Sequence, residues 1–135
     1  MKKIFGIFLL MGGLLTAIFA QNVAASKIPS AVKTAFTKNH PGVKVNWEIE
    51  KQNYEAGFTL NGKETSEAYS AAGSLLETEV SIKASEFPAA VMAKLKGMKV
   101  AEAAKITKAD GSVSYEAEVK GKDLLFDVNG NPVKP

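Results

Sequence analysis

Alternating apolar and polar residues over positions 52–70 predict a β-hairpin. Every second residue in the first part of this stretch is apolar, so a strand here would have one apolar face and one polar face. Asn61 and Gly62 follow at once, and this pair supplies the positive φ angles of a tight hairpin turn. A shorter copy of the pattern covers residues 115–122 and again begins with Tyr-Glu-Ala. The apolar positions of the first copy are Tyr54, Ala56, Phe58 and Leu60.

Two similar segments, residues 26–32 and 85–91, predict the starts of two helices. They align without a gap, and each contains a serine that can cap a helix and a proline that a first turn tolerates. The first helix should end near residues 39–42, where proline and glycine disfavour continuation. Both helices should be amphipathic. Their apolar faces comprise Ile28, Val32, Ala35 and Phe36 in the first and Phe87, Val91, Leu95 and Met98 in the second.

Further alternating stretches predict strands around the hairpin and after the second helix. Large aromatic residues in these strands alternate with glutamates, so we interpret Trp47, Tyr54, Phe58 and Tyr115 as core residues. Besides the first hairpin strand, the predicted strands cover residues 43–50, 63–69 and 75–82 in one half and 100–107, 113–120 and 124–128 in the other.

Each half is therefore expected to be a helix followed by an antiparallel β-meander, as a tandem repeat of residues 26–84 and 85–135. A sheet with one apolar face needs a cover, and two amphipathic helices can supply it. We expect an α+β fold with one antiparallel sheet of seven or eight strands and both helices on one face. The other face should meet water.

Residues 1–25 have the layout of a secretory signal peptide: Met-Lys-Lys, an uncharged apolar run, and small residues at the end. Cleavage can follow Ala20 or Ala25. A single membrane anchor is the alternative, but the run contains two adjacent glycines and lacks a basic flank. Residues 26–135 then form one domain, with no membrane association after cleavage.

The composition limits the possible compartments and partners of the protein. The chain has no cysteine, so neither a lipid anchor nor a disulfide is possible, and export to a bacterial periplasm or secretion is the simplest destination. The net charge of +3 falls to +1 when the two leader lysines are removed. All basic residues are lysines, and without the planar fork of arginine a nucleic-acid or nucleotide site is not expected.

The sequence offers no catalytic set. His40 is the only histidine and precedes a proline, so histidine-based triads and multi-histidine metal sites are not expected, and we interpret it as a solvated loop residue. Residues 127–131 resemble the start of a calcium loop, but the glycine comes early and no closing glutamate follows, so we interpret them as a turn. We predict no enzyme activity, no cofactor and no catalytic or metal-ligating residue.

The same alternation places many carboxylates on the face of the sheet away from the helices. We interpret this face as solvated, with protein binding as its candidate use. Lysines 33, 38, 94, 96 and 99 lie on the predicted helices and around them, so the molecule should be charge-polarised. The candidate partner-binding residues are Glu48, Glu50, Glu55, Glu77, Glu79, Glu116 and Glu118.

The chain resembles the PepSY-like family of exported bacterial proteins, also described as beta-lactamase-inhibitor-like. Many members have an aspartate before the closing glycine turn, as Asp127 stands here, whereas the first copy has Ser70. The resemblance implies a non-enzymatic domain that binds or restrains envelope proteins, including peptidases, but no inhibitory residue can be transferred. The matching positions are Ile28, Pro29, Val32, Phe36, Trp47, Tyr54, Glu55, Ala56 and Gly73, with a second set at Phe87, Pro88, Val91, Tyr115, Glu116, Ala117 and residues 127–130.

Two functions follow as hypotheses. The first is a protein-binding or inhibitor-like module that acts on an envelope protein. The alternative is a small-ligand or envelope-stress carrier that uses a cavity between helices and sheet, for which Gly57 and the alanine-rich residues 101–104 would leave space. The sequence identifies neither the partner nor the oligomeric state.

Overall fold

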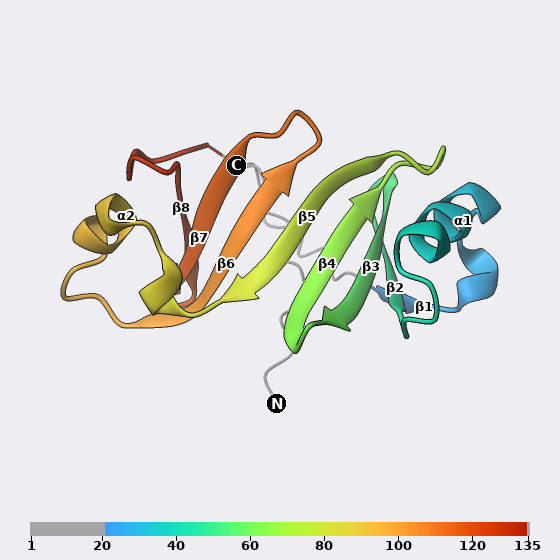
Figure 1. Cartoon of the computed structure of the whole chain (residues 1–135), viewed down its shortest axis with the longest axis horizontal. Helices are drawn as coiled ribbons and strands as arrows, with labels where there is room; N and C mark the ends of the chain where they lie inside the picture. Colours follow the sequence, from blue (N-terminus) through green and yellow to red (C-terminus); the bar gives the residue numbers. More distant parts are fainter. Residues whose placement is uncertain (1–20, 135) are drawn as a thin grey trace.

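A computed structural model describes residues 21–134 as one eight-stranded antiparallel sheet with two α-helices. The strands lie side by side in the order in which they occur along the chain (Figure 1). This architecture confirms the predicted α+β class. The strands are β1 (Gln21–Val23), β2 (Asn46–Glu50), β3 (Asn53–Leu60), β4 (Lys63–Tyr69), β5 (Leu75–Ile82), β6 (Val100–Lys108), β7 (Val113–Val119) and β8 (Lys122–Phe126).

Each α-helix follows a short 3-10 turn and precedes a set of strands. The turn η1 (Ala25–Lys27) leads into α1 (Ser30–Asn39), and η2 (Ala84–Glu86) leads into α2 (Ala89–Lys94). The helices lie at opposite ends of the twisted sheet (Figure 1). No helix in the described part of the chain is long and apolar enough to cross a membrane.

The helices cover the same face of the sheet, as predicted. Val32 and Phe36 of α1 pack in one cluster with Trp47 and Phe58, and Val91 of α2 packs in a second cluster. Residues that pair across neighbouring strands point to the same side of a sheet. Successive pairs lead from Phe58 in the first cluster across β4 to β7 to Phe126 in the second, so both clusters lie on the same face. The second cluster contains Phe87, Val91, Leu95, Ala103, Ala117 and Phe126.

The central hairpin forms where the pattern predicts it. β3 pairs with β4 in register from Leu60 and Lys63 to Tyr54 and Tyr69. Asn61 and Gly62 have φ angles of 52° and 76°, as a tight turn with two left-handed residues requires. Trp47 is only 5% exposed, which agrees with its predicted place in the core.

The two halves make the same close contact between a turn and a helix. Gly73 and Gly130 both have positive φ angles, and a Cβ atom on either would lie 2.6 Å from a helix carbonyl oxygen. The oxygens belong to Ala31 and Ala90, at matching positions of the two helices. Tyr54 pairs with Tyr69 and Tyr115 with Phe126, which also occupy matching positions. These contacts agree with a duplication, which stays a prediction.

The helix starts differ from the prediction. The prolines occupy the N-cap positions, and no side chain of the described residues caps either α-helix. The serines of the two matching segments lie in the preceding 3-10 turns. The second helix already ends at Lys94, so Met98 lies outside it and is 49% exposed, not on its apolar face.

Some strand limits also differ. β2 begins at Asn46 and β8 already begins at Lys122. β1 lies within the predicted leader, directly after its apolar run, and it pairs with β2. Three residues are too few to show an alternation. Residues 1–20, which carry most of the signal-peptide prediction, lie outside the described residues.

Candidate binding face

The predicted partner-binding residues do share one face of the sheet. Glu48 pairs with Glu55 across β2 and β3, and Ala68 of β4 connects Glu55 to Glu77. Because the register alternates, these side chains point away from the helices. We call this surface the acidic face. Its predicted members are Glu48, Glu50, Glu55, Glu77, Glu79, Glu116 and Glu118.

Three further carboxylates on the acidic face were missed from the sequence, and the first is Glu64 of β4, which pairs with Thr59. Glu118 of β7 pairs with Glu102 of β6 on one side and with Asp123 of β8 on the other. The predicted strand began at residue 124, so the alternation was not extended to Asp123. With these three residues, the acidic face runs from β2 to β8 and contains carboxylates from both halves of the chain.

The acidic face is less solvated than the alternation indicates. Glu48, Glu79 and Glu116 are 6%, 8% and 4% exposed. Each has one carboxylate oxygen that is buried and has no hydrogen-bond partner among the described residues. A buried polar atom without a partner costs free energy, more so if it is charged. The expectation of a fully hydrated face is therefore wrong at these three positions.

Burial and mutual repulsion shift the titration of these groups. Burial, followed by the charges of Glu116 and Glu55, raises the pKa of Glu79 to about 9. Burial, followed by the charge of Asp123, raises the pKa of Glu116 to about 8. Both carboxyls therefore retain a proton at neutral pH, and an arriving cation would favour their ionisation.

A hollow of about 480 Å³ lies at the β1–β4 end of the sheet, beside Gly57. Its lining residues come from β1 to β4 and the segments next to them, and they belong to both faces of the sheet. Among its polar residues are Glu48 and Glu55, both buried, and the exposed Asn22 and Asn46 at its edge. A second hollow, of about 610 Å³, lies where the β3–β4 turn approaches η2 and the start of β6.

Neither hollow matches the predicted cavity between helices and sheet. No residue of α1 or α2 lines either one. Gly57 pairs with Asn46 and Ser66, so it lies on the acidic face, on the side of the sheet away from the helices. Ala103, which was expected to leave space, packs in the second hydrophobic cluster.

The interpretation of His40 as a solvated loop residue is wrong. Its side chain is 15% exposed, and its Nε2 lies 2.6 Å from Oε1 of Glu67. The Tyr69 hydroxyl donates a hydrogen bond of 3.2 Å to the same oxygen. The imidazole also contacts the rings of Phe36 and Phe58, so it closes the first hydrophobic cluster. Burial, followed by the Glu67 charge, raises the pKa of Tyr69.

Residues 127–131 near the C-terminus form a turn, as predicted. Asp127 Oδ1 accepts hydrogen bonds of 2.9 Å from the backbone N–H groups of Asn129 and Asn131. These bonds hold the pKa of Asp127 below its usual value. No cluster of three or more histidine, cysteine or acidic residues in residues 21–134 is placed to hold a metal ion.

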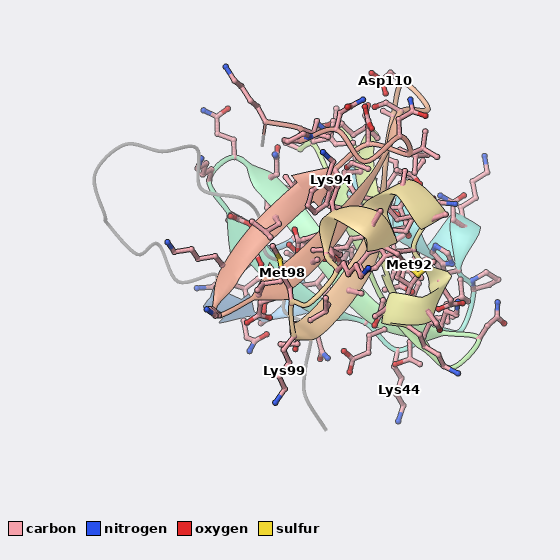
Figure 2. The ribbon with its side chains drawn as sticks, turned by 90° about the vertical axis from the view of Figure 1, so that its left-hand side faces the viewer. Lys44, Met92, Lys94, Met98, Lys99 and Asp110 are labelled. Carbon is pink, nitrogen blue, oxygen red and sulfur yellow. The ribbon has the colours of Figure 1, made fainter. Side chains whose placement is uncertain are left out.

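Two of the predicted lysines lie at α2 and in the segment that follows it. Figure 2 shows Lys94 and Lys99 on opposite sides of α2, with Met92 and Met98 labelled between them. Both methionines are exposed, at 43% and 49%. α2 covers the side of the sheet opposite the carboxylates, and the charge polarity of the molecule stays a prediction.

Solved structures show a fold like that of this chain. A candidate periplasmic protein of Bacteroides eggerthii has a TM-score of 0.72 at 21% identity, over 78% of this chain and 86% of its own. A DUF2874 family protein of Bacteroides uniformis has a TM-score of 0.71 at 20% identity, with the same two shares covered. A BLIP-like protein of Bacteroides fragilis has a TM-score of 0.65 at 22% identity, over 78% of this chain and 84% of its own.

The fold is therefore that of the BLIP-like and DUF2874 proteins of Bacteroides. No protein family and no curated protein sequence matches the chain. The beta-lactamase-inhibitor-like half of the predicted resemblance is supported at the level of fold, and its PepSY-like half stays a prediction.

Proposed function

We propose that this protein is a non-enzymatic binding module of the bacterial periplasm. Its acidic face binds an envelope protein that has a positively charged surface. The leader-like start of the chain, the absence of cysteine and the fold shared with candidate periplasmic proteins support the compartment. The absence of a catalytic constellation among the sequence motifs favours binding over catalysis.

One observation carries the proposal. Carboxylates from both halves of the chain converge on one face. Five of them have a buried oxygen without a hydrogen-bond partner among the described residues, namely Glu48, Glu50, Glu79, Glu116 and Asp123. Such a surface is costly in the free protein, and a partner that supplies ammonium or guanidinium groups would remove part of that cost. A partner with an acidic surface would be repelled.

The test is a charge reversal on the acidic face. We expect the double variant Glu77→Lys, Glu118→Lys to lose the envelope proteins that crosslink to the wild-type protein in extracts. The control, Glu86→Lys with Asp110→Lys, makes the same change in net charge at exposed carboxylates outside the face. Circular dichroism establishes that both variants fold.

A partner identified in this way should bind more weakly as salt increases from about 50 to about 300 mM, because screening weakens charge pairing. If both double variants lose that partner equally, binding depends on the overall charge of the protein, which would contradict the proposal. Unchanged capture by the face variant would contradict it as well.

A further inference from the structure

Two buried carboxyls of the acidic face lie on either side of β6. Glu79 of β5 pairs with Ile106 of β6, and Glu116 of β7 pairs with Ala104, two positions away on the same strand. Side chains two positions apart share a face of the sheet, so all four point away from the helices. The two glutamates are 8% and 4% exposed. We call them the Glu79–Glu116 pair.

Each member of the pair has an oxygen without a partner. Oε1 of Glu79 and Oε2 of Glu116 are buried, and neither has a hydrogen-bond partner among the described residues. Of the charges that act on Glu79, that of Glu116 acts most strongly, so the two carboxyls are close enough to interact. Ionising both at once is unfavourable because their charges repel each other. A cation that donates several hydrogen bonds would satisfy the two oxygens and offset the repulsion.

The surroundings of the pair are strongly acidic. Each strand from β3 to β8 contributes one further carboxylate to the same face, and these are Glu55, Glu64, Glu77, Glu102, Glu118 and Asp123. Lys108 of β6 lies on the face too, but it pairs with Glu77, and its charge counteracts the raised pKa of that carboxyl. An arriving cation is therefore attracted to the pair, and an anion is repelled.

Apolar side chains lie between and beside the two carboxyls. Ile106 and Ala104, which separate them in the register, are 5% and 3% exposed. Leu125 of β8 lies beside Glu116 on the same face. A guanidinium suits such a floor, because it is planar, weakly hydrated and donates several hydrogen bonds in its own plane. An ammonium is a compact and more strongly hydrated charge, so its transfer to a buried site costs more free energy.

We propose that the Glu79–Glu116 pair binds the guanidinium of an arginine side chain of the partner protein, which lies over Ala104 and Ile106 and donates to both carboxylates. This inference rests on the proposed function, because the partner supplies the arginine, and it adds the residue type and its place on the acidic face. The bound cation favours the ionised form of both carboxyls. Binding should therefore release protons at neutral pH and become tighter as pH rises.

The test follows the backbone amides of Ala104 and Ile106 by NMR while N-acetyl-arginine-methylamide is added at low salt. We expect saturable shifts at both amides and weaker binding of N-acetyl-lysine-methylamide. Between pH 7 and pH 8 the affinity for the arginine derivative should rise at least about fivefold, because the ionised fraction of a carboxyl with the pKa of Glu116, about 8, rises by that factor. An exposed glutamate is already ionised at pH 7, so binding elsewhere on the surface would show no such rise.

Two substitutions remove the acceptors with little change in volume. Glu79→Gln and Glu116→Gln each replace a carboxyl that holds a proton at neutral pH by a neutral amide, so both variants should fold. We expect each to weaken binding at pH 8 at least about tenfold, which is about 1.4 kcal/mol, and the double variant to lose the pH dependence. Asp110→Asn removes a carboxylate at the exposed β6–β7 turn and should leave the affinity unchanged (Figure 2).

The inference is overturned if the wild-type protein gives no saturable shift, if the lysine derivative binds as tightly as the arginine derivative, or if the affinity is the same at pH 7 and pH 8. It is also overturned if both glutamine variants bind as tightly as wild type, or if Asp110→Asn weakens binding equally. Tighter binding of free arginine than of the blocked derivative would overturn the assignment to a side chain of a partner.

The outcome for this site can be separated from the outcome for the proposed function. Binding of the arginine derivative that depends on the pair, together with unchanged capture by Glu77→Lys, Glu118→Lys, would uphold the guanidinium site and refute the proposed function. Loss of the partner by that double variant, without any binding of the arginine derivative to wild type, would refute the site and support the proposed function.

Discussion

Replacing Glu79 by glutamine should make the stability of the protein less dependent on pH. The pKa of Glu79 is about 9 in the folded protein, against 4.5 for an ordinary glutamate. Between these two values the folded state binds more protons than the unfolded state. The free energy of unfolding therefore falls as pH rises through this window. A glutamine at this position would be neutral in both states and would remove this contribution.

The size of the effect follows from the two pKa values. Between about pH 5 and pH 7 the carboxyl of Glu79 ionises in the unfolded chain, which stabilises the unfolded state progressively. In the folded state Glu79 stays protonated over the same interval. Proton linkage gives about 2.6 kcal/mol of stability lost by wild type over this interval through Glu79. Glu116 acts in the same direction, because burial also raises its pKa. Glu79→Gln should therefore flatten the pH dependence without abolishing it.

The assay is urea unfolding at pH 5, 6 and 7, followed by the fluorescence of Trp47, which is 5% exposed in the folded state. Asp110→Asn is the matched control. The pKa of Asp110 is held below 3.8 by its hydrogen bonds with Ser112, so this residue titrates outside the interval. The reasoning is refuted if Glu79→Gln and wild type lose the same stability between pH 5 and pH 7.

Further substitutions test the packing that supports the face. Gly73→Ala and Gly130→Ala should each lower the free energy of unfolding by about 3 kcal/mol, because a positive φ angle combines with a 2.6 Å approach to a helix carbonyl. Urea midpoints within experimental error of wild type would count against this account of the two turns. His40→Ala should lower the free energy of unfolding by about 3 kcal/mol, because the buried Glu67 carboxylate then loses one of its partners. Lys99→Ala, at the matching exposed position of the other half, should change stability by less than about 0.5 kcal/mol, and equal effects would contradict the role of His40.

The strands could be predicted because their signal is local. A period of two, with Asn61 and Gly62 at the turn, fixes which side chains of the hairpin share a face. The helix starts could not be predicted as well, because serine and proline both suit a first turn. The second helix was predicted too long since Met98 continues the helical spacing of apolar residues, although the chain has already left the helix.

The candidate site could be predicted only in part. The alternation correctly places the glutamates on one face, because successive side chains of any strand point to opposite faces of the sheet. Their burial depends on how neighbouring strands pack side by side, which no local pattern encodes. The contact between His40 and Glu67 joins residues 27 positions apart and has no signature in either segment. It was missed because a histidine before a proline is typical of a loop.

Site-specific photocrosslinking in bacterial cells tests the central claim most directly. The photoreactive residue benzoylphenylalanine is placed at position 77 on the acidic face or at position 92 on α2, which is exposed on the opposite side of the molecule. We predict a discrete crosslinked protein from position 77 and none from position 92. A partner that crosslinks from position 92 but not from position 77 would contradict the assignment of binding to the acidic face.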